Sequence, residues 1–217
     1  MNPLNQRLIQ RRYRRCSTST VEPTDRPARR TQRGATLVEA SLVTTLFLFL
    51  VFAIFEMGLL FRDSLTTNNA SREAARAAST KGRDHDADYY TIRVTEHGLG
   101  AMGLQSLEYM VVFKASGPGD TVPGACLSAS QAGLCNRYTP ADFFAEIEDS
   151  GGNPTGNFGC GTLDAAWCPT GREARASVGP DYVGVYIKTR HSYLTGMFGT
   201  QTDLEATTIL RIEPDTR

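Results

Sequence analysis

One apolar run constrains this chain more than any other feature of its sequence. Residues 40–61 contain a single charged side chain, Glu56. As a helix these 22 residues would be about 33 Å long, whereas the hydrocarbon core of a bilayer is about 30 Å thick. The sequence contains no second run of comparable length. It therefore predicts a single-pass membrane protein whose first partner is the lipid bilayer.

The charge distribution predicts which way the chain crosses the membrane. Residues 1–34 contain nine Arg and two acidic residues, a net charge of +7. Residues 35–217 contain 14 Lys and Arg and 21 Asp and Glu, a net charge of −7. Because positively charged segments stay in the cytoplasm, we expect the N-terminus inside and the bulk of the chain outside. This topology accounts for the basic leader, so we expect no nucleic-acid partner.

A secretory signal peptide is the competing interpretation of the apolar run. Its cleavage site would follow the run, with small residues at the −3 and −1 positions. The run is instead followed by Arg62 and Asp63, and a candidate cleavage residue, Gly34, precedes it. Glu39 lies between this glycine and the run, where a charged side chain is costly unless it is compensated. The sequence therefore favours processing before the run.

A helix is predicted to continue beyond the apolar run. Residues 62–81 contain neither Pro nor Gly, and Gly82 then provides a helix stop. One helix from Thr36 or Ala35 to Lys81 would contain about 46 residues and be about 70 Å long. Four alanines after the apolar run would share one face of this helix. Such a face of small residues would let a neighbouring backbone approach closely, although alanine also simply favours helix. The residues that share this face are Ala70, Ala74, Ala77 and Ala78.

These segments together resemble the TadE-like family, the minor pilins or pseudopilins of the Tad (Flp) type IVb pilus. The resemblance rests on Arg33-Gly-Ala-Thr-Leu-Val-Glu39 with the apolar run behind it, on Ile54-Phe-Glu-Met-Gly58, and on Ala70-Ser-Arg-Glu-Ala-Ala-Arg-Ala77. It implies a prepilin peptidase that cuts between Gly34 and Ala35. It also implies partners among the other Tad pilins and the pilus assembly platform. A minor role is implied because the major pilins of this system are far shorter.

The two carboxylates of the apolar region have different expected roles. Cleavage would create an α-amino group at Ala35, which is mostly cationic near neutral pH. Glu39 lies one helical turn away and can pair with that amine, either in its own chain or in a neighbouring chain. In the competing interpretation Glu39 merely reaches the cytoplasmic interface. Glu56 lies near the outer boundary, where it can contact a partner inside the membrane or simply face headgroups.

The residues after the helix are predicted to form one small α+β domain, residues 83–217. Three segments are rich in β-branched and aromatic residues, and the last two are expected to pair antiparallel. A short helix is expected to begin near Asp88 and to end near Gly98. Polar loops rich in Gly and Pro fill 115–140 and 149–181. The outline is pilin-like: a long helix followed by a small antiparallel sheet. The predicted strands are 107–113, 182–190 and 204–212.

The cysteines indicate an oxidising compartment. Cys16 lies in the leader and would be lost on processing, which leaves Cys126, Cys135, Cys160 and Cys168 outside. Four cysteines allow three connectivities, and we expect the two local pairs, 126–135 and 160–168. Each bond would stabilise the domain by roughly 2–3 kcal/mol. A zinc site is disfavoured because the spacings C-x8-C and C-x7-C lack the short gap of zinc-binding motifs.

Nothing in the sequence indicates catalysis, a cofactor or a resident metal. The acidic stretch 84–88 contains one histidine but lacks the glycine and distal glutamate of an EF-hand, so we expect a solvated loop. His97 and His191 belong to no recognisable catalytic motif. We therefore expect a non-enzymatic protein. The alternative to a pilin is an unprocessed single-pass membrane protein whose disulfide-bonded outer domain binds a ligand or partner.

Overall fold

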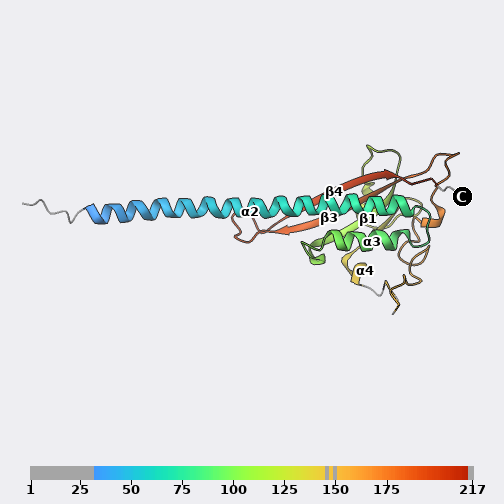
Figure 1. Cartoon of the computed structure of the whole chain (residues 1–217), viewed down its shortest axis with the longest axis horizontal. Coiled ribbons are helices and arrows are strands. Elements are labelled where there is room, and N and C mark those ends of the chain that lie inside the picture. Colours follow the sequence, from blue (N-terminus) through green and yellow to red (C-terminus); the bar gives the residue numbers. More distant parts are fainter. Residues whose placement is uncertain (1–31, 145–146, 149–150, 215–217) are drawn as a thin grey trace, which may run out of the picture. The chain divides into compact units, whose positions relative to one another are not determined.

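The computed structural model describes residues 32–144, 147–148 and 151–214 (Figure 1). The basic leader up to residue 31, including Cys16, lies outside the described residues. The chain divides into two compact units, one ending at Phe47 and the other beginning at Leu48. We call the described residues from 62 to 214 the head.

Two helices come first among the described elements, and four strands, one short helix and three 3-10 helices follow. The longest is α2, which is four residues longer than the 46-residue estimate. The helices are α2 (Gln32–Lys81), α3 (Ala87–Gly98) and α4 (Pro140–Phe144). The 3-10 helices are η2 (Leu104–Ser106), η3 (Gly124–Leu127) and η4 (Pro169–Gly171). The strands are β1 (Leu107–Ala115), β2 (Cys135–Tyr138), β3 (Tyr182–Ser192) and β4 (Gln201–Arg211).

The strands form one antiparallel sheet in the order β2-β1-β3-β4. The three predicted strands are all present, and β3 and β4 pair as expected over eleven residues, from Tyr182 opposite Arg211 to Ser192 opposite Gln201. The predicted α+β architecture, a long helix followed by a small antiparallel sheet, is confirmed. The prediction was wrong to place all of 115–140 in loops, because β2 adds a fourth strand beside β1.

The C-terminal half of α2 packs on the sheet through small side chains. Ala70, Ala74 and Ala78 are fully buried, as the small-residue face requires. The fourth buried alanine is Ala75, whereas the predicted Ala77 is only partly buried. A Cβ atom added to Gly98 of α3 would lie 2.9 Å from the Cβ of Ala70. The close approach of α3 to α2 therefore depends on having small residues on both helices.

The sheet is covered on both faces near its centre. Alternate residues of β1 point to opposite faces, so Met110 and Val112 join the core under the helices, while Val111 and Phe113 face away. The second face is covered by η3, which a disulfide between Cys126 and Cys135 attaches to the start of β2. The register places Phe113 opposite Gly184, whose missing side chain makes room for the ring.

A fully buried ion pair joins α3 to the long loop before β3. The Arg172 guanidinium lies 2.7 Å from Asp88, and both side chains are 0% exposed. Asp88 also accepts hydrogen bonds from the Asn136 amide at 2.8 Å and the Tyr138 hydroxyl at 2.7 Å. Arg172 stacks over the ring of Trp167. The prediction that residues 84–88 form a solvated loop was therefore wrong for Asp88, although Asp84 and His85 are exposed.

This network fixes the loop that carries the second disulfide. The side-chain oxygen of Asn136 accepts a hydrogen bond from the backbone N–H of Trp167 at 2.8 Å. The second disulfide joins Cys160 to Cys168, so both pairs follow the local connectivity. Asp164 accepts from the N–H groups of Gly159 and Cys160, while burial raises its pKa. The loop is therefore organised by buried polar contacts as well as by its cross-link.

Candidate functional site on the apolar helix

The predicted processing residues lie in the first turns of α2. Helix α2 begins at Gln32, and Gly34 and Ala35 are both exposed. Apart from the nearby backbone of its own helix, no heavy atom of the described residues lies within 4 Å of the position that a Cβ on Gly34 would take. Glycine in a helix costs about 1 kcal/mol relative to alanine, and helix ends fray at little cost. The peptide bond after Gly34 is therefore at an accessible end of the helix.

Glu39 lies on the surface of the same helix. It is exposed, and no hydrogen bond or ion pair joins it to another residue in the part of the chain that the structure describes. It follows Ala35 by four residues, so the two are one helical turn apart. The geometry leaves the carboxylate free to pair with a cation from outside this part of the chain.

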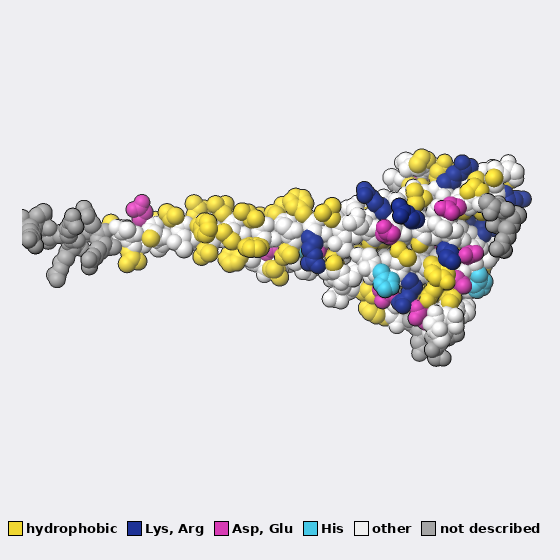
Figure 2. Space-filling view, in the orientation of Figure 1, with side chains coloured by type: hydrophobic (Ala, Val, Ile, Leu, Met, Phe, Trp, Pro, Cys, Tyr) yellow, Lys and Arg dark blue, Asp and Glu magenta, His cyan; other side chains and the backbone are white. Residues whose placement is uncertain are grey.

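The apolar segment, residues 40–61 of α2, presents large hydrophobic side chains to its surroundings. Figure 2 shows hydrophobic side chains along the surface of α2. Leu42 is 68% exposed, Phe55 is 67% exposed and Phe61 is 63% exposed. Within the described residues α2 is the one helix long and apolar enough to cross a membrane. Such exposure is unfavourable in water, so this segment requires lipid or other helices around it.

The hydroxyl groups near the start of the apolar segment are satisfied inside the helix. The Ser41 hydroxyl donates to the Val38 carbonyl at 2.7 Å, and the Thr45 hydroxyl donates to the Ser41 carbonyl at 2.8 Å. Unsatisfied polar groups are costly in hydrocarbon, so these bonds suit the segment to a membrane interior. The structure supports a single-pass membrane protein.

Glu56 has a partner in its own chain that the sequence did not suggest. Its side chain is almost completely buried, at 1% exposure. One carboxylate oxygen accepts from the Leu194 N–H at 3.2 Å, and the other accepts from the Thr195 N–H. Both donors lie in the loop between β3 and β4. Glu56 therefore holds the end of the β3–β4 hairpin against the apolar segment.

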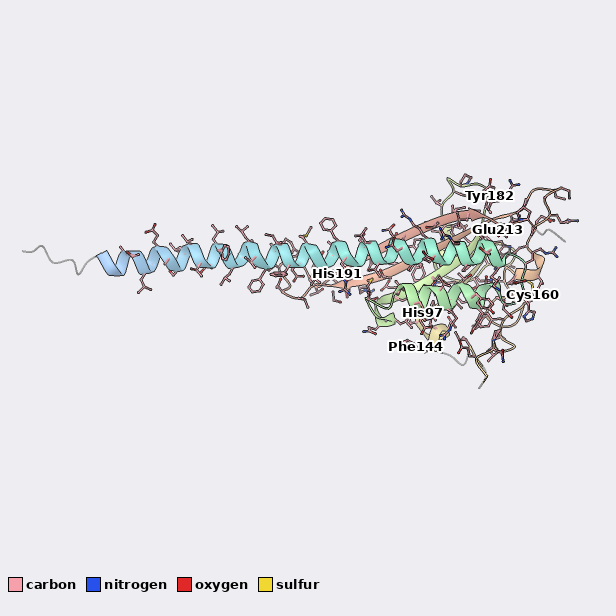
Figure 3. The ribbon with its side chains drawn as sticks, viewed as in Figure 1. His97, Phe144, Cys160, Tyr182, His191 and Glu213 are labelled. Atoms are coloured by element: carbon pink, nitrogen blue, oxygen red, sulfur yellow. A yellow bond between two sulfur atoms is a disulfide. The ribbon has the colours of Figure 1, made fainter. Side chains whose placement is uncertain are left out.

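Further polar contacts join α2 to the hairpin beyond Glu56. The Asp63 carboxylate lies 2.7 Å from Nδ1 of His191, which is 3% exposed and lies beside α2 (Figure 3). The hydroxyls of Thr67 and Thr189 are 2.8 Å apart. No partner of His191 was predictable from the sequence, because Asp63 is 128 residues away. These contacts fix the hairpin along α2 for several turns.

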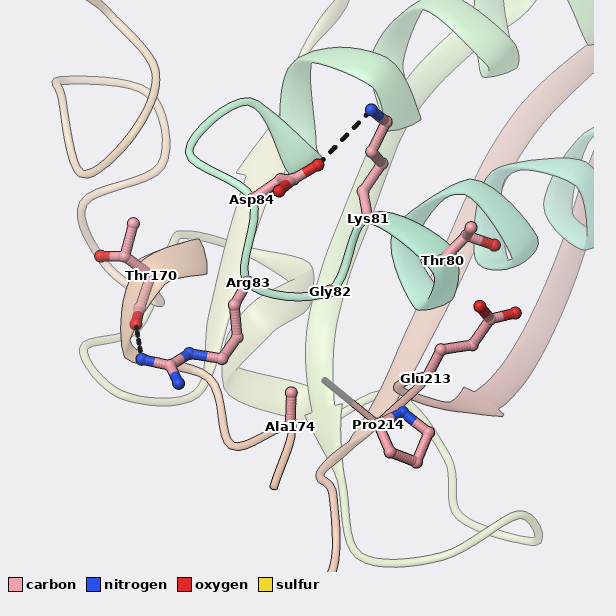
Figure 4. A pocket seen from close by; sticks show the side chains of 9 residues that line it. All are labelled: Thr80, Lys81, Gly82, Arg83, Asp84, Thr170, Ala174, Glu213 and Pro214. Carbon is pink, nitrogen blue, oxygen red and sulfur yellow. Dashed lines mark hydrogen bonds and ion pairs between the residues drawn. The ribbon is translucent and has the colours of Figure 1, made fainter. Parts of the chain in front are cut away.

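We call the part of α2 that packs on the sheet, with buried residues from Thr67 to Ser79, the packed part of α2. A polar pocket of about 410 Å³ lies at its C-terminal end, far from the tip of the hairpin (Figure 4). Three of the four charged side chains that line it, those of Lys81, Arg83 and Asp84, already have partners. The Lys81 ammonium lies 3.4 Å from Asp84, and the Arg83 guanidinium donates to the Thr170 carbonyl at 3.2 Å. Among the described residues no group of three or more His, Cys, Asp or Glu side chains could hold a metal ion. The pocket therefore contains no constellation that indicates a ligand.

Comparison with known proteins identifies the segment that begins at the glycine. The family model described as TadE-like protein matches residues 34–76. Residues 34–76 are a TadE-like domain. The expected resemblance is confirmed over this segment, which includes Glu39, the apolar segment and most of the packed part of α2. No curated protein and no solved structure matches the chain. The TadE-like domain thus associates this protein with the Tad pilus system, whose TadE-like family is structural rather than enzymatic.

Proposed function

We propose that this protein is a minor pilin or pseudopilin of a Tad (Flp) pilus that acts in pilus assembly, initiation or adhesion. In this proposal residues 1–34 are a cytoplasmic leader, residues 35–82 are the assembly helix and residues 83–217 are an extracytoplasmic domain. The observation that carries the proposal is the exposed apolar segment, which begins within a TadE-like domain immediately behind Gly34 and Glu39. Its partners are the prepilin peptidase, the other Tad pilins, the assembly platform and the bilayer.

The exposed apolar segment supports packing against like helices. Most of its large side chains are exposed, and an apolar groove lies between Leu50, Ile54, Met57 and Phe61. Gly58 also lines this groove, with open space around it. Small residues between large ones let a neighbouring helix approach closely. The same surface can therefore face lipid before assembly and other pilins after it.

The charge pattern supports the direction of insertion. The leader is strongly basic, and such segments remain in the cytoplasm. The two disulfides suit an oxidising compartment, which the cytoplasm is not. Both arguments point to an N-terminus inside and a head outside.

Cleavage after Gly34 is tested by the intact mass and N-terminal sequence of the membrane-extracted protein. In cells with an active prepilin peptidase we expect a chain that begins at Ala35. In cells with an inactivated peptidase, which serve as the control, we expect the leader to be retained. A leader retained in both strains would contradict processing and would favour the unprocessed single-pass receptor or binding protein.

Glu39→Ala tests the assembly carboxylate. We expect normal cleavage but strongly reduced piliation, because the mature α-amino group loses its counter-charge. Glu73→Ala is the matched control, since Glu73 is an exposed carboxylate on the packed part of the same helix. The measurement is the amount of sheared surface pili, with cleavage followed by mass. Normal piliation in Glu39→Ala would show that the carboxylate is dispensable.

A further inference from the structure

The loop that closes the β3–β4 hairpin exposes apolar side chains. Residues 193–200 form this loop, which we call the tip loop. Leu194 is 79% exposed and Phe198 is 48% exposed. No charged residue occurs between His191 and Asp203. An exposed apolar loop without charges is costly in water, so this end of the hairpin requires an apolar or interfacial environment.

Glu56 fixes the depth of the tip loop. Its carboxylate accepts from the N–H groups of Leu194 and Thr195, so these residues lie beside the helical turn that contains Glu56. Glu56 precedes the last residue of the apolar segment, Phe61, by five positions, which is about 8 Å along a helix axis. Interfacial elements bury their apolar faces by roughly 5–10 Å. The tip loop is therefore held at the depth of an interfacial insertion whenever the apolar segment spans a bilayer.

The backbone of the tip loop is prepared for a poorly hydrated environment. Glu56 satisfies two of its N–H groups, and the Tyr193 N–H donates to the Thr200 carbonyl at 3.1 Å. The Met197 N–H donates to the hydroxyl of Thr195 at 3.4 Å. Backbone groups at membrane depth must be satisfied internally, because hydrocarbon offers no partner. With the Gly199 N–H, which donates to the Gly196 carbonyl at 3.4 Å, five of the eight N–H groups of residues 193–200 therefore have a partner.

Charged side chains begin where the loop ends. Lys188 on β3 lies 2.8 Å from Asp203 on β4, and Arg190 pairs with Glu108. On α2 the first charged residue after the apolar segment is Arg62, whose guanidinium donates to the Ala101 carbonyl at 2.6 Å. Charged residues therefore give way to apolar ones at similar heights along the β3–β4 hairpin and along α2. Elements that cross the same membrane surface show this pattern.

We propose that the tip loop is a second membrane contact, which inserts Leu194 and Phe198 between the lipid headgroups and the upper acyl chains beside α2. The proposal depends on insertion of the apolar segment and does not depend on the pilin function. Lipid is the occupant because Glu56 holds the loop against a segment that itself spans the bilayer. The contact resists tilting of the head relative to the membrane. It also gives the buried carboxylate of Glu56 a function, the positioning of the loop.

Quenching by brominated lipid tests this insertion. The full-length chain carrying Leu194→Trp is placed at one copy per nanodisc in phosphatidylcholine brominated near the top of its acyl chains. We expect the added tryptophan to lose roughly half of its fluorescence, as insertion by about 5–10 Å would place it near the bromines. Trp167 provides a constant background, because it is buried in the head. Leu194 is largely exposed, so the substitution leaves the fold intact.

Val178→Trp is the matched control. Val178 is 66% exposed and lies just before β3, at the far end of that strand from the tip loop. A tryptophan there should lose no fluorescence in brominated lipid, which separates real insertion from the general preference of tryptophan for membrane surfaces. Equal quenching at the two positions would overturn the proposal. So would protection of Leu194→Trp from aqueous iodide that appears only at two copies per disc, because it would assign the loop to a neighbouring chain.

Glu56→Gln tests the positioning role. The amide keeps one acceptor oxygen where the carboxylate has two, so one of the two loop N–H groups loses its partner. We expect weaker quenching of Leu194→Trp in this background and unchanged quenching in a Glu73→Gln background. Unchanged quenching in Glu56→Gln would show that the loop does not depend on the carboxylate and would overturn that part of the proposal.

Discussion

The apolar segment of α2 exposes large side chains, whereas the part of α2 that packs in the head buries small ones. The buried residues of that packed part are Thr67, Ala70, Ser71, Ala74, Ala75, Ala78 and Ser79. Size therefore follows the partner: small residues admit the chain's own sheet, and large residues are left for lipid or other helices.

The carboxylates of the two regions also differ in their exposure and in the number of hydrogen-bond donors around them. Glu39 is exposed and has no hydrogen bond or ion pair with another described residue, whereas Asp88 has three donors and is fully buried. Glu56 stands between these cases, because a loop from the head supplies its two donors. A carboxylate whose donors lie in its own chain stabilises the fold. A carboxylate that lacks such donors, as Glu39 does, is free to pair with a cation from outside the described part of the chain.

Asp88→Asn should have the largest effect on stability. All three partners of Asp88 are donors, so the NH₂ group of asparagine would face a donor and Arg172 would remain buried without its counter-charge. Breaking a buried pair in this way costs about 3–5 kcal/mol. The free energy of unfolding is measured by urea titration of the detergent-solubilised chain, with Trp167 fluorescence as the signal. Glu39→Gln is the control and should leave this value unchanged; a loss below about 1 kcal/mol in Asp88→Asn would contradict the network.

Ala74→Leu tests the size rule directly. Ala74 is fully buried, so a leucine must displace the sheet or a neighbouring helix, and overpacking of this kind costs about 1–3 kcal/mol. Ala40→Leu is the matched control at an exposed position of the apolar segment and should not destabilise the head. The same urea titration applies to both. A neutral result at Ala74 would mean that the packed part of α2 tolerates large side chains, and the comparison would fail.

Gly98→Ala and Gly58→Ala form a smaller test of the same rule. A Cβ on Gly98 would lie 3.0 Å from Cα of Ala70, so the two helices must separate slightly. We expect a loss of about 1 kcal/mol, since the helix propensity of alanine offsets part of the strain. Gly58 has open space around it, so Gly58→Ala should be neutral or slightly stabilising. Equal thermal shifts for the two variants would argue against a close contact between α2 and α3.

The sequence predicted the elements that depend on local pattern. The apolar run, the absence of Pro and Gly up to Lys81, and the positive φ of Gly82 account for the length and end of α2. The strands were recognised from their β-branched and aromatic residues. Strand β2 was missed because it has four residues, and its pairing with β1 supplies what its own sequence lacks.

The polar contacts were not predictable in this way. Glu56 is 138 residues from Leu194, and Asp63 is 128 residues from His191. Periodicity and composition report neighbours along the chain, whereas these pairs exist only after the hairpin has been placed on α2. One available signal was the uncharged stretch between His191 and Asp203, which predicts an unusual environment for a loop of the head.

The ion pair next to the tip loop should give the smallest effect, visible as a dependence on pH. A hydrogen bond from Lys188 holds the pKa of Asp203 below its usual value, and the same contact raises the pKa of Lys188. The contribution of Asp203 is therefore present above about pH 4 and is lost as the pH falls through its lowered pKa. That of Lys188 is present below about pH 10 and is lost as the pH rises through its raised pKa.

Lys188→Met removes this pair together with the weaker contact of Lys188 with Glu205 at 3.5 Å. Other carboxylates with lowered pKa values, such as Asp120 and Glu173, contribute equally to both proteins and cancel in the difference. We expect the stability difference between wild type and Lys188→Met to be constant between about pH 5 and 9 and to shrink outside that range. Thermal unfolding across this series measures it. A difference that does not depend on pH would show that Lys188 acts through the packing of its aliphatic stem, and the charged boundary above the tip loop would then contribute nothing to the stability of the hairpin.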